Sequence, residues 1–126
     1  MLDEINNSKR LQEAMKLGQF RIRNYVVEQR DYRIPEDIAI LELVRTGKLD
    51  CNTLGDTVTI LSYNGQLFEL NLVAAIIWDC LKYGSVNVDN IVKELISIFN
   101  ESESILADVS EFIQVLCENN LIELDR

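Results

Sequence analysis

The chain has 126 residues, 48% of them apolar and 26% charged, which predicts a single globular domain long enough to bury a core of its own. Its formal net charge is −9, and the whole imbalance lies in residues 51–126, because residues 1–50 carry nine basic and nine acidic side chains. This acidity disfavours binding to phosphate backbones, and the absence of histidine excludes Ser-His-Asp and Cys-His mechanisms and the usual imidazole ligand of zinc.

The N-terminal part is predicted to be an extension ahead of the main domain. Residues 1–18 show a loosely helical spacing of apolar side chains. Residues 20–27 alternate apolar and basic side chains, which is typical of a half-exposed strand. A break at residues 31–35, which contains the one proline, separates an extension over residues 1–31 from a domain over residues 32–126.

The segment 36–46 has two readings. Pro35 at a first helical position, followed by two acidic residues, favours a helix. The β-branched content of the segment permits a strand that ends at Thr46-Gly47. We favour the strand, because the segment that follows is best explained as part of a small sheet.

The clearest β signal lies in residues 57–70. Thr57–Leu61 alternates polar and apolar side chains, and Gln66–Leu70 is the expected return strand. Asn64-Gly65 between them is the strongest short hairpin marker, since both residues tolerate a positive φ. A two-stranded hairpin is marginal alone, so we expect a third strand and a helical layer.

Three amphipathic helices are predicted after the hairpin, which gives an α+β chain. Trp78 lies in the apolar stripe of the first helix and is interpreted as a core residue. Asn120 is expected to supply the left-handed end of the third helix, and residues 121–124 an apolar tail that packs back. The helices are expected from Asn71 to Gly84, from Asn87 or Asp89 onward, and from about Ile105 to Glu118.

No group of side chains indicates catalysis or a metal site. Cys80 and Cys117 fall in predicted helices without a basic neighbour, and Cys51 has no obvious base, so the cysteines are interpreted as small apolar side chains in a reducing compartment. The acidic residues lack the glycine and spacing of a calcium loop and are interpreted as solvated. We expect no catalytic residue, no metal and no cofactor.

One basic cluster, Arg21, Arg23, Arg30 and Arg33, is interleaved with aromatic residues. Such a pattern suits contact with RNA or with an acidic partner. Because the chain as a whole is acidic, the preferred interpretation is that the cluster faces the protein's own acidic half or a partner enzyme.

A string of short motifs runs through residues 54–124. The motifs are Gly55-Asp56, Asn64-Gly65, Leu70-Asn71, Ala74, Ile77-Trp78, Leu81, Gly84, Ile91, Leu95, Phe99, Asp108-Val109, Phe112-Ile113, Leu116 and Leu121-Ile122. In this order and spacing they resemble the PqqD-like family, the recognition elements of pathways that modify ribosomally made peptides. Val73 and Asn120 depart from the threonine and glycine that the family often has there.

The resemblance implies a winged-helix-like α+β fold, with a three-stranded antiparallel sheet followed by three helices. It also implies non-catalytic binding of the leader segment of a precursor peptide, as a strand added along residues 66–70 and against the helix near residues 105–118. The leader would be presented to a modifying enzyme, such as a radical S-adenosylmethionine enzyme, or to a leader peptidase.

Four apolar residues of that helix form a stripe that we expect to line the peptide groove, although a core position is an equally good reading for Val109 and Ile113. The expected peptide-binding residues are Gln66, Leu67, Phe68, Glu69, Leu70, Leu106, Val109, Ile113 and Cys117.

Two alternative functions stay open. A winged-helix DNA-binding regulator would share the fold, but its recognition helix needs basic side chains, and the helix near residues 105–118 has none. An adaptor would dock a partner enzyme through residues 1–18 and 20–27.

The expected setting is the cytoplasm. The polar N-terminus is not a signal peptide and no apolar run is long enough for a membrane span, so we expect no membrane partner. Because the chain is acidic, we also expect no nucleic acid as a partner. The acidic half is expected to favour leaders or enzyme surfaces that carry Lys or Arg, with salt-dependent association.

Overall fold

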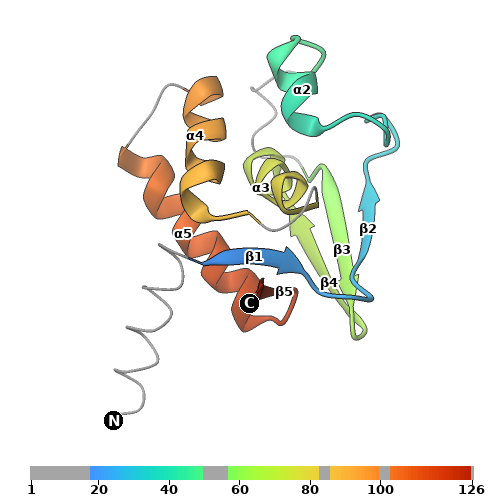
Figure 1. The fold of residues 1–126 in the computed structure, drawn as a ribbon. Helices are drawn as coiled ribbons and strands as arrows, with labels where there is room; N and C mark the ends of the chain where they lie inside the picture. The colour runs from blue at the N-terminus through green and yellow to red at the C-terminus, as the bar shows by residue number, and fades with distance from the viewer. Residues whose placement is uncertain (1–17, 50–56, 83–85, 100–102, 126) are drawn as a thin grey trace. The chain divides into compact units, whose positions relative to one another are not determined.

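The computed structural model describes residues 18–49, 57–82, 86–99 and 103–125 of the chain (Figure 1). The chain divides into two compact units, and one of them is discontinuous in sequence. Residues 24–83 form one unit, while residues 1–23 and 84–126 form the other. Each unit is described by itself below. The expected domain boundary near residue 31 stays a prediction.

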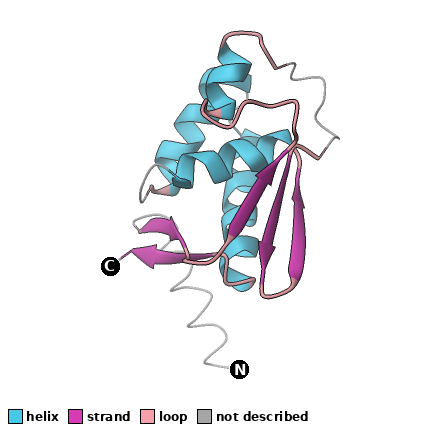
Figure 2. Cartoon of the chain, turned by 90° about the vertical axis from the view of Figure 1, so that its right-hand side faces the viewer, coloured by secondary structure: helices cyan, strands magenta, loops and turns pink. Residues whose placement is uncertain are grey.

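The unit of residues 24–83 is built on a three-stranded antiparallel sheet with the order β2-β3-β4. Its strands are β2 (Val27–Arg30), β3 (Thr59–Tyr63) and β4 (Gln66–Leu70), and Figure 2 shows them side by side. The turn between β3 and β4 is the predicted one. Asn64 has φ 51° and Gly65 has φ 78°, the two positive values of a type I′ hairpin, so the hairpin prediction is confirmed.

Two helices complete this unit, α2 (Ile40–Arg45) and α3 (Leu72–Lys82). Helix α3 begins as predicted, because the Asn71 side chain accepts a hydrogen bond from the backbone N–H of Ala74 at 3.0 Å. Trp78 is buried in the core, as expected.

Two predictions about the strands of this unit are wrong. The segment 36–46 contains helix α2, not a strand, because Ile40, Leu43 and Val44 are buried at helical spacing. The third strand is β2 instead. The single strand predicted over residues 20–27 is in fact the end of one strand, a turn, and the start of β2. The turn includes Tyr25 at φ 73°, a conformation that its bulky side chain does not signal.

The discontinuous unit joins two strands, β1 (Gln19–Ile22) and β5 (Ile122–Asp125), to two helices, α4 (Val88–Phe99) and α5 (Glu103–Glu118). Antiparallel pairing places Phe20 opposite Leu124. Phe20 also exchanges two backbone hydrogen bonds with Val86. The predicted apolar tail is therefore a strand.

The ends of the two helices follow the sequence signals. The side chain of Asn87 accepts a hydrogen bond from the N–H of Asn90 at 2.9 Å and caps α4. Helix α5 ends at a left-handed Asn120 with φ 61°, and the N–H of Leu121 returns to the carbonyl oxygen of Leu116 at 2.9 Å.

The predicted α+β class is confirmed, with a three-stranded antiparallel sheet and helices α3, α4 and α5 after it. Residues 1–17 of the expected N-terminal helix, the stop at Gly84 and Cys51 fall outside the described residues. None of the described helices is both long enough and apolar enough to span a bilayer.

Candidate functional site

Strand β4 is an edge strand, and among the described residues no other strand pairs with its outer side. In a hairpin with a two-residue turn, the closing pair Tyr63–Gln66 is hydrogen-bonded, and the pairing alternates from there. The backbone N–H and C=O groups of Leu67 and Glu69 therefore point away from β3. They form a short row of donors and acceptors that an extended peptide can pair with.

The side chains of β4 divide between the two faces of the sheet. Leu67 is 71% exposed and Glu69 is also exposed, on one face. On the other face Leu70 is buried, Phe68 is half-buried and Gln66 is exposed. An apolar side chain as exposed as Leu67 on an open edge is what a strand-pairing surface offers to a partner.

The predicted residues of α5 differ in exposure. Leu106 is 49% exposed, whereas Val109 and Ile113 are each 0% exposed, as core positions are. Cys117 is half-buried, and burial together with the charge of Glu118 raises the pKa of its thiol, so the thiol stays protonated at neutral pH. Leu106 and Cys117 are thus the expected contact residues of this helix that reach solvent.

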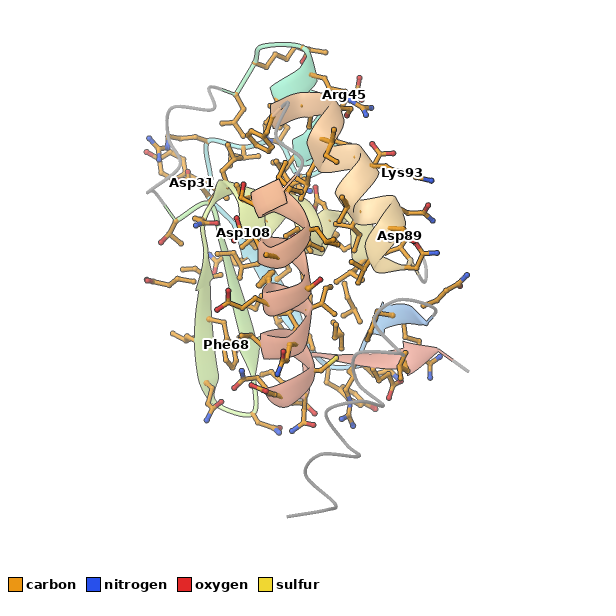
Figure 3. All side chains as sticks on the ribbon, turned by 90° about the vertical axis from the view of Figure 1, so that its left-hand side faces the viewer. Asp31, Arg45, Phe68, Asp89, Lys93 and Asp108 are labelled. Atoms are coloured by element: carbon orange, nitrogen blue, oxygen red, sulfur yellow. The ribbon has the colours of Figure 1, made fainter. Side chains whose placement is uncertain are left out.

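The charges exposed on α5 are acidic. Asp108, Glu111 and Glu118 are exposed, and Figure 3 shows Asp108 on the outside of the helix. The helix contains no Lys or Arg. This sign is wrong for contact with phosphates, which counts against the DNA-binding alternative.

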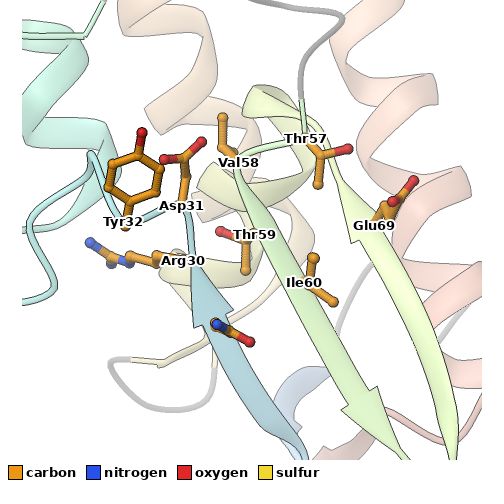
Figure 4. Close-up of a pocket in the computed structure, with 9 residues that line it drawn as sticks. Arg30, Asp31, Tyr32, Thr57, Val58, Thr59, Ile60 and Glu69 are labelled. Carbon is orange, nitrogen blue, oxygen red and sulfur yellow. The ribbon is translucent and has the colours of Figure 1, made fainter.

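A hollow that the sequence did not predict opens at one end of the three-stranded sheet. Its volume is about 360 Å³. Figure 4 shows Tyr32 and Asp31 on one side of it and Thr57 and Glu69 on the other. The residues that line it are Gln29, Arg30, Asp31, Tyr32, Thr57, Val58, Thr59, Ile60 and Glu69.

The carboxylate of Asp31 at this hollow already has a cation. Arg33 donates from Nε to Oδ1 at 3.0 Å and from Nη2 to Oδ2 at 2.7 Å. The side-chain hydrogen bonds from Arg33, followed by its backbone N–H, lower the pKa of Asp31 to about 2. Asp31 is therefore ionised and neutralised by Arg33 at any physiological pH.

Three arginines of the basic cluster contact carboxylates of the protein's own acidic half, as one of the two preferred interpretations has it, whereas Arg33 pairs with a carboxylate outside that half. Arg21 and Arg23 both lie near Glu123, at 2.8 Å and 3.9 Å. Arg33 pairs with Asp31. Arg30 is buried and pairs with Asp79 of α3.

The Arg30–Asp79 pair is a structural centre that the sequence did not reveal. Nη2 of Arg30 donates to both carboxylate oxygens of Asp79, at 3.0 Å and 2.9 Å, and Nη1 donates to the carbonyls of Pro35 and Ile38 at 2.6 Å and 2.7 Å. Asp79 also accepts from the N–H of Ile40 at 2.7 Å, so it caps α2, whose own N-cap residue makes no side-chain bond. The positive helix end and the guanidinium share one carboxylate. The sequence signal that could have revealed this centre is Asp79 itself, an acidic residue on an otherwise apolar face of its helix.

No three His, Cys, Asp or Glu side chains gather into a metal site within the described part of the chain. The two described cysteines, Cys80 and Cys117, are both half-buried.

Comparison with known proteins gives one match. Residues 39–122, more than half of the chain, match the family model described as coenzyme PQQ synthesis protein D (PqqD). A search of curated proteins and a search of solved structures found no match. The PqqD family consists of non-catalytic accessory domains of peptide-modification pathways.

Proposed function

The chain belongs to the PqqD family, which gives it a role in a peptide-modification pathway, and from this premise we propose that it binds the leader segment of a ribosomally made precursor peptide. The leader adds as a fourth strand along β4. The chain catalyses no reaction itself. It presents the leader to a separate enzyme, such as a radical S-adenosylmethionine enzyme or a leader peptidase.

The observation that carries this proposal is the open edge of β4. Leu67 and Glu69 each direct one backbone donor and one acceptor outward, and each net hydrogen bond with a peptide contributes about 1 kcal/mol. The exposed side chain of Leu67 adds apolar area that a peptide side chain can cover. Backbone pairing supports affinity for many sequences, and the side chains supply the selectivity.

Helix α5 is proposed as a peptide-contact element in its own right. Its exposed members, Leu106 and Cys117, are the side chains that a peptide can reach directly. The buried members, Val109 and Ile113, are expected to act by keeping the helix packed. Leu106→Ala is therefore expected to weaken leader binding without unfolding the chain, whereas Ile113→Ala is expected to reduce stability first.

The experiment is a titration of the full chain against a fluorescently labelled leader, taken from a precursor-like reading frame beside this gene. We expect saturable binding with a Kd below about 100 μM, or about −5.5 kcal/mol. Binding weaker than this would contradict the proposal.

A matched pair of variants separates the backbone from the side chain. Leu67→Ala removes only the side chain, whereas Leu67→Pro also removes an N–H that points away from β3 and blocks the approach of a strand. We expect Leu67→Pro to abolish binding and Leu67→Ala to weaken it. Equal binding by the two variants would show that no strand pairs with this edge.

A further inference from the structure

The cross-strand register of the sheet places six side chains on the face that carries Leu67 and Glu69. Antiparallel pairing puts Gln29, Ile60 and Glu69 in one row across the three strands. The neighbouring row on the same face is Val27, Ser62 and Leu67, because side chains two positions apart along a strand share a face. We call this surface the outer face of the sheet.

The outer face carries one charge. Of its six residues only Glu69 is ionisable, and Glu69 forms no ion pair with any residue that the structure describes. It lines the hollow together with its row neighbours Gln29 and Ile60. The other acidic residue there, Asp31, is bound by Arg33, so Glu69 is the carboxylate left to attract a cation.

The neighbouring row is apolar at both ends. Val27 on β2 and Leu67 on β4 are both exposed, with Ser62 between them. Leu67 and Glu69 are both on β4, so an apolar site and an acidic site lie two residues apart on the open edge.

An added strand extends each row of a sheet by one residue. The residue beside Glu69 and the residue beside Leu67 would then be separated by one position in the peptide, and both side chains would lie on the outer face. The intervening residue would lie on the other face, with Phe68.

We infer that β4 selects extended peptides in which a Lys or Arg and a large apolar residue are separated by one position, with the basic side chain beside Glu69 and the apolar side chain beside Leu67. This inference rests on the proposed function, since it names the peptide chemistry that the same edge takes. Cross-strand pairing of opposite charges and apolar contact on one face supply the preference. The order of the two residues depends on strand direction. An antiparallel peptide has the basic residue first, and a parallel peptide has it last.

The test uses short fluorescein-labelled synthetic peptides of alternating Thr and Val as probes of the full chain at low salt. One pair carries Lys and Leu separated by one residue, in either order. A second pair has Lys and Leu adjacent, so that they lie on opposite faces, and a third keeps the spacing but replaces Lys with Glu. We expect one order of the first pair to bind about two- to fivefold more tightly than the other two pairs.

Variants of Glu69 assign the effect to this residue. Glu69→Gln should remove the preference for Lys, and Glu69→Lys should reverse it in favour of the Glu peptide. Glu36→Gln, which makes the same change at another exposed glutamate of the same unit, should leave the preference intact.

The possible failures are distinguishable. If all peptides bind equally, or if Glu69→Gln keeps the preference for Lys, the inference is wrong while strand addition stands. If no peptide binds, and the labelled leader also fails to bind, the proposed function and the inference fall together. If the leader binds and the model peptides do not, the Leu-and-Lys pattern is insufficient and the inference is wrong.

Discussion

Replacing Asp79 with leucine should remove the centre of the unit formed by residues 24–83. Arg30 and Asp79 have side-chain exposures of 3% and 2%, so neither charge can be stabilised by water when its partner is lost. Asp79→Leu leaves the guanidinium of Arg30 with its bonds to the carbonyls of Pro35 and Ile38, and with Glu28, 3.6 Å away, as the remaining carboxylate among the described residues. It also leaves the N–H of Ile40 without its cap.

The expected loss is about 3–5 kcal/mol in the free energy of unfolding, the range for breaking one partner of a buried pair. For a chain of this size such a loss lowers Tm by roughly 10–20 °C. The measurement is urea and thermal unfolding of the full chain, followed by circular dichroism. Arg21→Ala is the matched control, because its ion pair with Glu123 is exposed, and it should cost less than about 1 kcal/mol.

The double variant Arg30→Met/Asp79→Leu tests the reasoning further. With both charges removed, the remaining cost comes from the unpaired carbonyls of Pro35 and Ile38 and the uncapped Ile40. The double variant should therefore be more stable than the sum of the two single losses predicts, by about 2 kcal/mol or more. A loss below about 1 kcal/mol for Asp79→Leu alone, or strict additivity, would refute the assignment of this pair as the structural centre.

Four further experiments, three on altered chains and one on Cys117 of the unaltered chain, have defined expected outcomes. Gly65→Ala should lower the free energy of unfolding by about 1–2 kcal/mol in urea, since φ at this position is 78°. Arg33→Ala should return the pKa of Asp31 from about 2 toward 3.8, as an NMR titration can measure. Because the wild-type pKa is lowered, the stabilisation by this pair is present above pH 3.8 and is lost as the pH falls through about 2. Cys117 should be alkylated more slowly than a model thiol at neutral pH and faster as the pH rises, as site-resolved mass spectrometry can check, because its pKa is raised. The chain shortened to residues 32–126 should lose cooperative unfolding, because it lacks β2 and leaves Asp79 without Arg30.

Local signals were sufficient where one residue type solves a local problem. Asn64-Gly65 supplies two positive φ angles, and Asn71 and Asn120 supply a helix cap and a left-handed end, so the hairpin and two helix boundaries were predictable. The candidate edge β4 was predicted with its observed bounds for the same reason.

The features that the sequence did not predict depend on distant partners. Helix α2 is capped by Asp79, a residue from another helix, so its own sequence lacks a cap signal and its β-branched residues favoured a strand. Strand β5 exists because β1 pairs with it. The outer face of the sheet, with Glu69 as its one charge, became visible only once the register of β2 and β3 was known.

The pairing of β1 with β5 also sets an order for folding during synthesis. Arg21 and Glu123 are 102 positions apart, whereas the paired strands β2, β3 and β4 all lie within residues 24–83. The segment can therefore complete its sheet while the ribosome is still making α4 and α5. Strand β1, which is made before it, cannot pair with β5 until residues 122–125 have been made. Among the described strands β1 is thus made first and its partner β5 last, so the discontinuous unit is completed only after the segment that it encloses in sequence has been made.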